Sequence, residues 1–129
     1  MYDIVESINK SKKEKVEIVE LSYGLNDLNP VMSKDTMDYH YGKLAHGYAD
    51  RYNKAEGDSD FNYAGAYLHN LYFSQFRAPQ ENNTPNGPVL NLIKRKYGYW
   101  RDFKEEFKET AMKIQGSGWI YLTQQGSIE

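Results

Sequence analysis

The sequence contains no cysteine, which excludes disulfides, thiolate metal sites and cysteine nucleophiles and fits a reducing compartment. Long apolar runs are also missing. The opening stretch MYDIVESINKSKKEKVEIVEL holds no apolar segment that is long enough for a signal peptide or a membrane span. We therefore expect a soluble protein located in the cytoplasm.

Neither basic nor acidic residues are in large excess. Sixteen basic and eighteen acidic residues give a net charge of −2 and a pI near 5.9. No basic surplus points to a nucleic acid or an anionic membrane as a partner. The sequence also lacks a phosphate-binding loop, a dinucleotide fingerprint, a His-Glu-x-x-His helix and a Gly-x-Ser-x-Gly elbow, which removes the function classes that depend on them.

Tyrosine is unusually abundant. The 129 residues include 12 Tyr but only 5 Phe, within an otherwise ordinary globular balance of 40% apolar and 26% charged residues. A buried tyrosine hydroxyl needs a hydrogen-bond partner. The composition therefore favours a core with polar networks, or an aromatic-lined site or interface.

Two helices are predicted in the first half of the chain. Ser33 is a candidate N-cap after the Asn29-Pro30 turn, and the helix runs over residues 35–53, where apolar residues recur at spacings of three and four. These residues are Met37, Tyr41, Leu44, Tyr48 and Tyr52. Glycine and polar residues at 56–59 interrupt the pattern, and a second helix follows over about residues 60–76.

Two more helices are predicted after a proline-rich loop. Three of the four prolines fall within residues 78–88, which marks a loop and a boundary between subdomains. The third helix begins at Pro88 and ends near Gly98, and the fourth ends at Gly116 and Gly118. The apolar face of the fourth helix consists of Trp100, Phe103, Phe107, Ala111 and Ile114.

The last residues predict a strand over 119–123, followed by a turn over 124–127. A single strand leaves unpaired backbone groups on both edges, so we expect it to pair with strands of a complementary chain or of a second copy in a homo-oligomer. The domains expected are a charged arm over 1–20, solvated or in a short helix, a helical hairpin over 21–77, and a partial domain over 88–129.

Three histidines, His40, His46 and His69, are the candidates for metal chemistry. His40 and His69 lie on the two predicted helices of the hairpin, and facing helices commonly donate one ligand each to a metal site. Two histidines are too few for a closed site. By residue type alone, a pair of partly buried, hydrogen-bonded histidines is the favoured interpretation.

Four stretches carry a more specific pattern, which begins with Thr36-Met37 shortly before His40 and a tyrosine eight residues after it. The stretches are Leu28–Tyr48, Asn62–Phe73, Gly98–Phe107 and Gly116–Leu122. In order and spacing they resemble the iron/manganese superoxide dismutases over about residues 21–123. The resemblance implies an α+β fold, with an N-terminal helical hairpin and the start of an α/β domain that is truncated after its first strand.

The same resemblance implies the site residues. His40 and His69 would be ligands of one manganese or iron ion, and Tyr48 would be a catalytic gateway residue that hydrogen-bonds to solvent at the site. Phe73 and Trp119 would wall the metal pocket, and Gly65 stands where iron enzymes carry Gln, which favours manganese. Helical geometry places Tyr48 about 12 Å along the axis from His40 and about 80° round it.

Departures from the family pattern bear on the same site. The Asp-x-Trp-Glu-His segment, which supplies the family's other two ligands, is not in this sequence. Leu44, which cannot hydrogen-bond, stands four residues after the first ligand, where the family usually has a histidine, and Leu68 replaces an asparagine. The expected site is therefore half complete, with a looser hydrogen-bonded shell around it.

The resemblance implies a superoxide dismutase that converts superoxide into oxygen and hydrogen peroxide, with a metal site completed by residues outside this sequence. The isolated chain is expected to be inactive. The alternatives are a non-catalytic structural or interaction protein with the superoxide dismutase fold, and a truncated product with no function. Joint retention of His40, Tyr48, His69 and Trp119 favours the enzyme, because a structural remnant has no need for two histidines aimed at one point.

Overall fold

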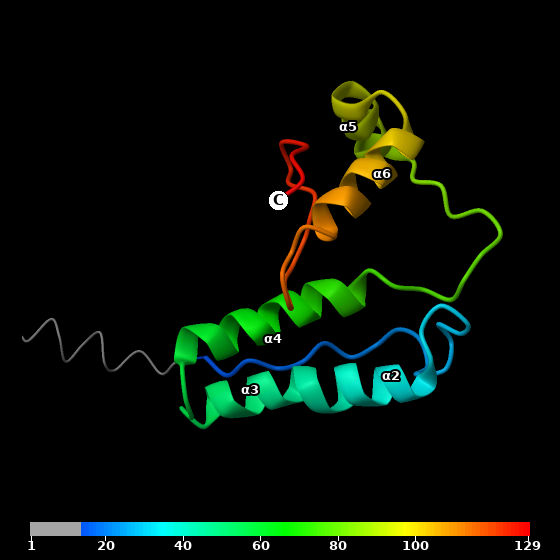
Figure 1. Ribbon diagram of the computed structural model, residues 1–129. Coiled ribbons are helices and arrows are strands. Elements are labelled where there is room, and N and C mark those ends of the chain that lie inside the picture. The colour runs from blue at the N-terminus through cyan, green and yellow to red at the C-terminus, as the bar shows by residue number, and fades with distance from the viewer. Residues whose placement is uncertain (1–13) are drawn as a thin grey trace, which may run out of the picture. The chain divides into compact units, whose positions relative to one another are not determined.

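The computed structural model describes residues 14–129 (Figure 1). They divide into two compact units, one that ends at Glu81 and one that runs from Asn82 to Glu129. The first thirteen residues of the expected charged arm lie outside the described residues. Within residues 14–129, no helix combines the length and the apolar character needed to cross a bilayer.

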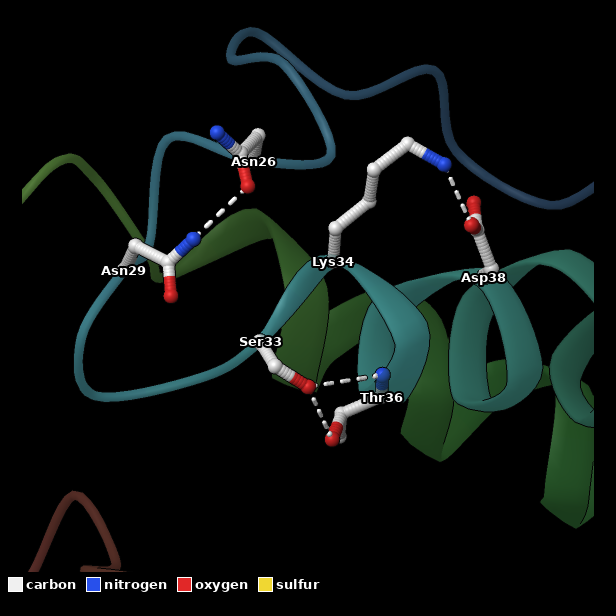
Figure 2. A network of polar contacts seen from close by, with 6 residues as sticks. All are labelled: Asn26, Asn29, Ser33, Lys34, Thr36 and Asp38. Atoms are coloured by element: carbon white, nitrogen blue, oxygen red, sulfur yellow. Dashed lines mark hydrogen bonds and ion pairs between the residues drawn. The ribbon is translucent and has the colours of Figure 1, made fainter.

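One long helix opens the first unit. It consists of α2 (Lys34–Tyr39), the π-helical segment η1 (His40–Ala45) and α3 (His46–Asn53). Ser33 caps its start as expected, because its hydroxyl oxygen accepts the backbone N–H of Thr36 at 3.1 Å (Figure 2). The helix predicted over 35–53 is confirmed, whereas the change of helix type at its centre was not expected.

The turn before this helix and its exposed face are held by local polar contacts (Figure 2). The amide of Asn29 donates to Asn26 Oδ1 at 2.7 Å within the turn. On the helix surface, Lys34 pairs with Asp38 one turn later. Both side chains of that ion pair are exposed, so the pair contributes little to stability.

The second helix, α4 (Ser59–Ser74), packs against the long helix. Asp58 caps its start by accepting the backbone N–H of Phe61 at 2.8 Å. Four buried residues recur along it at spacings of four, three and four, which places them on one face. They are Asn62, Ala66, His69 and Phe73. Two of the four are polar, which is unusual for the inner face of a hairpin.

The core of this unit lies between the two helices and the chain that precedes them. Leu28, Met37, Ala45 and Phe73 are its buried residues. Partly buried aromatic and aliphatic side chains pack around them. Full burial of side chains such as Met37 and Phe73 stabilises the fold by about 1.5–3 kcal/mol each.

Residues 14–22, here called the N-terminal strap, run extended along the hairpin (Figure 1). Two asparagine amides hold the strap by pairing with its backbone. Asn53 bonds both the N–H and the carbonyl of Val16, at 2.9 and 2.8 Å. Asn70 accepts the N–H of Val19 and donates to the Glu17 carbonyl, both at 2.8 Å. Each amide thus takes the place of a neighbouring strand.

The solvated arm or short helix that we expected over 1–20 is therefore wrong for the residues from 14 onward. The charged side chains of the strap are exposed as anticipated, but Ile18, Val19 and Leu21 pack against the core. Tyr41 adds a further tie by donating its hydroxyl to the Val19 carbonyl at 2.9 Å. The packing of these apolar residues could not be recognised from the sequence, because an extended segment of this kind has no helical period.

The second unit contains α5 (Gly87–Tyr97) and α6 (Trp100–Ala111), which pack on each other. Pro88 lies in the first turn of α5, and Gly98 ends that helix with a φ of 79°, as predicted. The core of this unit is small, with Ile93 and Phe103 buried. Our expectation that α6 runs on to Gly116 is wrong, because the helix ends at Ala111.

The strand expected over 119–123 is also wrong. Within the described residues, the last segment forms a single antiparallel bridge between Leu122 and Ile128. Tyr121 and Glu129 exchange both backbone hydrogen bonds, at 2.8 and 3.0 Å. Gly126, with a φ of 86°, turns the chain back so that these groups find partners within the chain. The predicted turn at 124–127 is confirmed, and this pairing removes the premise of an unpaired strand.

Replacing Asn70 with Ala should release the strap. The change leaves two backbone groups of the strap without their partner, so we expect the free energy of unfolding to fall by about 1–2 kcal/mol. Urea unfolding gives the loss, and amide exchange at Val19 should accelerate in parallel. Asn91→Ala, at an exposed site on α5, should change the stability by no more than about 0.5 kcal/mol. Equal losses in both variants would contradict the role assigned to Asn70.

Candidate metal centre

His40 and His69 meet inside the helical hairpin. Their Nε2 atoms lie 3.1 Å apart, and their ring centroids lie 5.0 Å apart with an interplanar angle of 85°. Two bonds of about 2.1 Å from one metal ion to two imidazoles, at nearly a right angle, span about 3 Å. The separation of the two nitrogens therefore suits two ligands of one ion as well as a hydrogen bond between two histidines.

The tautomer of His69 is fixed by its own helix. Its Nδ1 lies 2.6 Å from the carbonyl oxygen of Gly65, which can only accept a hydrogen bond. Nδ1 therefore carries the proton, and in the neutral ring Nε2 carries the lone pair that faces His40. A histidine that donates one ring N–H to a backbone carbonyl is the usual arrangement of a metal ligand.

The surroundings of the pair favour the neutral form of His40. Burial, and to a smaller extent the neighbouring His69 ring, lower the pKa of His40 below its ordinary value. Phe73 lies against both rings, with centroid distances of 5.1 Å to His40 and 6.0 Å to His69. Neutral imidazoles beside an apolar wall are suited to metal binding, because only the neutral ring offers a lone pair.

Tyr48 also faces His69, with ring centroids 5.4 Å apart and the rings inclined by 29°. The rotation of 80° expected between Tyr48 and His40 is wrong, because η1 lies between them. A π turn holds one residue more than an α turn, and the remaining seven steps rotate about 700°, which is within about 20° of two full turns. The π-helical segment therefore returns Tyr48 to the face of the helix that carries His40.

Gly65 serves the centre in two ways. Its carbonyl accepts the His69 proton, and its missing side chain admits the Tyr48 ring. A Cβ built on Gly65 would lie 2.6 Å from both Cγ and Cδ1 of Tyr48, which is closer than real atoms approach. In this structure, glycine at position 65 is therefore a requirement for packing.

The first unit thus brings together five of the six site residues predicted from the sequence: His40, Tyr48, Gly65, His69 and Phe73. Trp119 belongs to the second unit, and its part in the site stays a prediction. Leu44, in η1, is partly exposed. Sequence reasoning missed Tyr72, whose ring centroid lies 5.4 Å from that of His40 and whose pKa burial raises. Its position one turn after His69 was the available signal.

The donor set of the centre comprises the two imidazoles. Among the residues that the structure describes, no group of three or more histidine, cysteine, aspartate or glutamate side chains lies close enough to hold a metal ion. The two nitrogens fit iron or manganese as part of a ligand set, because imidazole suits both metals.

Comparison with known families decides the relationship. Residues 15–62 match the model of the iron/manganese superoxide dismutase α-hairpin domain. Residues 85–129 match the model of the C-terminal domain of the same proteins. The chain belongs to the iron/manganese superoxide dismutase family. The resemblance seen in the sequence is thereby confirmed, and the family's metal is manganese or iron.

Individual superoxide dismutases agree with this assignment. A manganese/iron superoxide dismutase of Porphyromonas gingivalis is 37% identical over 125 residues, which cover 82% of this chain and 64% of the relative. An iron superoxide dismutase of Bacteroides fragilis is 36% identical over 83% of this chain and 65% of its own length. One of Saccharolobus solfataricus is 31% identical over 90% of this chain and 67% of its own. The chain spans just under two thirds of the first two superoxide dismutases.

Gly65→Ala should weaken the hairpin, although alanine is the better helix former by about 1 kcal/mol. The added methyl group forces the Tyr48 ring or the whole helix to move, and overpacking of this kind costs about 1–3 kcal/mol. Gly42→Ala is the matched control, since nothing lies within 4 Å of a Cβ at that position. We expect urea unfolding to show a loss for Gly65→Ala and no loss for Gly42→Ala. A gain at position 65 would refute the close contact.

Deleting Gly42 should be tolerated, because the deletion converts the π turn into an α turn and leaves both flanking segments in register. We expect the stability to change by less than about 1 kcal/mol. Deleting Ala64, in the regular helix α4, rotates Asn62 by about 100° away from the buried face and should cost about 3 kcal/mol or more. Urea unfolding compares the two deletions. Similar losses from both would show that the π segment does not absorb an extra residue.

Proposed function

We propose that this chain is part of a superoxide dismutase, which converts two superoxide anions and two protons into oxygen and hydrogen peroxide. The observation that carries the proposal is the convergence of the Nε2 atoms of His40 and His69 at 3.1 Å, with the His69 tautomer set by Gly65. Membership in the family and the names of the relatives support the same activity.

An iron or manganese ion held by His40 and His69 would supply the one-electron chemistry that dismutation needs. Its remaining ligands would come from residues outside this sequence, in a continuation of the polypeptide or in a second chain. A carboxylate among them would offset the charge that two neutral imidazoles leave uncompensated. The source of these residues is a proposal, as is a cytoplasmic location.

The other residues of the cluster have supporting roles in this proposal. Tyr48 orders solvent and passes protons at the site, from a ring that contacts His69. Phe73 is fully buried and keeps one side of the histidine pair dry. We assign Trp119 to the same wall by resemblance. Gly65 orients His69 through its carbonyl, so this glycine has a structural role. By resemblance, glycine at this position also favours manganese.

A second candidate is a non-catalytic protein with the same fold that binds a partner. Exposed aromatic residues on α4 favour it, because Tyr63 and Tyr67 stack at 6.2 Å on the surface. Surface patches of this kind often mark interaction sites. The dismutase is the stronger proposal, since a docking surface does not need the fixed tautomer of His69.

The test is reconstitution of activity. The chain is mixed with a polypeptide that carries the family's Asp-x-Trp-Glu-His segment, in the presence of manganese or iron, and superoxide consumption is measured. We expect background activity in the chain alone and clear activity in the mixture. His40→Ala and His69→Ala should each abolish it, because each removes a ligand. Tyr48→Phe should lower it about tenfold, because only a hydroxyl is lost.

Elemental analysis of each sample separates failure to bind metal from failure to react. Full activity in the lone chain would show that the two histidines do not depend on outside ligands. A mixture that assembles and binds metal but shows no activity would favour the second candidate.

A further inference from the structure

Arg51 occupies an unusual place beside Tyr48. It lies three residues later on α3, and its guanidinium carbon lies 5.0 Å from the centre of the Tyr48 ring. Its Nε donates a hydrogen bond to Asn62 Oδ1 at 3.0 Å. One side chain therefore contacts the ring that faces His69 and also reaches the neighbouring helix α4.

Asn62, which accepts the hydrogen bond from Arg51, is itself fixed in position. It is only 3% exposed, and both ends of its amide are engaged. Oδ1 accepts from Arg51, and Nδ2 donates to the carbonyl of Glu56 at 2.9 Å. A buried amide with both ends satisfied has one favoured orientation. The direction of the Arg51 hydrogen bond is therefore set by α4 and by the loop between the helices.

Gly47 leaves space for the guanidinium of Arg51. A Cβ built on Gly47 would lie 3.1 Å from Arg51 Nη1, so a side chain there would press on it. The guanidinium thus lies near Gly47, which has no side chain, near the buried amide of Asn62 and near the face of the Tyr48 ring. Gly65 lies against the same ring, because a Cβ at position 65 would be 2.6 Å from Tyr48 Cγ.

The charge of Arg51 needs an explanation beyond packing. Within residues 14–129, no carboxylate lies at ion-pair distance from this half-buried side chain. A hydrogen bond that joins two helices requires only a neutral donor. A guanidinium also attracts the face of an aromatic ring and fixes the ring's orientation through its rigid plane.

We propose that Arg51 is a positioning residue, which holds the Tyr48 ring in contact with His69 and Gly65. The positional claim concerns the described hairpin itself. Its consequence for catalysis rests on the proposed dismutase function, in which Tyr48 must stay beside the ligand His69. Loss of the guanidinium lets the ring rotate away without separating the helices.

The experiment compares three substitutions in the full chain. Arg51→Gln keeps an N–H donor for Asn62 but has no charge, Arg51→Met keeps the length of the stem alone, and Arg51→Lys keeps the charge without the planar fork. Arg95→Gln, at an exposed site on α5, is the matched control. Nuclear Overhauser contacts from the labelled Tyr48 ring to Gly65 Hα and the His69 ring report its position, and urea unfolding reports stability.

We expect the contacts of Tyr48 to weaken at least twofold in Arg51→Gln and Arg51→Met, while Arg51→Lys retains more than half of them. The urea midpoint of Arg51→Gln should match that of Arg95→Gln. Unchanged contacts in the Gln and Met variants would overturn the proposal. A loss of contacts in all three variants that follows the loss of stability would also overturn it, because Arg51 would then be a general tie between helices. If Arg51→Met does not fold, the comparison of Gln with Lys decides.

The catalytic consequence is measured in the reconstituted enzyme. Arg51→Gln should lower the dismutation rate about tenfold at unchanged metal content, and Arg51→Lys should restore part of it. Unchanged activity in Arg51→Gln would overturn the catalytic part of the proposal. A wild-type mixture without activity would refute the dismutase function, while the contacts of Tyr48 in the lone chain would still decide the positional claim.

Discussion

The hydrogen bond from His69 Nδ1 to the Gly65 carbonyl, at 2.6 Å, is the constraint on which the rest of the centre depends. It fixes which ring nitrogen holds the proton, and so directs the lone pair of His69 at His40. The bond is local to one helix, because it joins residues four apart. What makes it effective is burial, since a ring that is 5% exposed has few other partners for that proton.

Close packing at the same glycine ties the chemistry of the centre to the fold. Gly65 offers no Cβ, so the Tyr48 ring rests directly on α4. The ring reaches that position only because η1 absorbs one residue of the long helix. A π turn gives up the regular hydrogen-bond pattern of an α-helix. Here that change of pattern brings Tyr48, His40 and His69 together. The hairpin is thus shaped by its polar residues as much as by its apolar core.

Side-chain amides have the corresponding role at the edges of the unit. Asn53 and Asn70 hold the N-terminal strap by its backbone, and Asn62 holds both Arg51 and the loop between the helices. Among the described residues, every buried side-chain nitrogen and oxygen has a hydrogen-bond partner. The abundance of tyrosine fits the same design, because Tyr23 and Tyr41 donate their hydroxyls to backbone carbonyls around the core.

The sequence alone determined the helices, most of their limits and the pairing of His40 with His69. Apolar spacing, the cap at Ser33, and the proline and glycine near the ends of α5 are local signals with local causes. Only the tertiary structure decided the π turn at His40 and the packed strap. Each of these depends on contacts between residues far apart in the chain, or on a helix that gives up its regular period to meet them, and such contacts leave no periodic trace in the sequence.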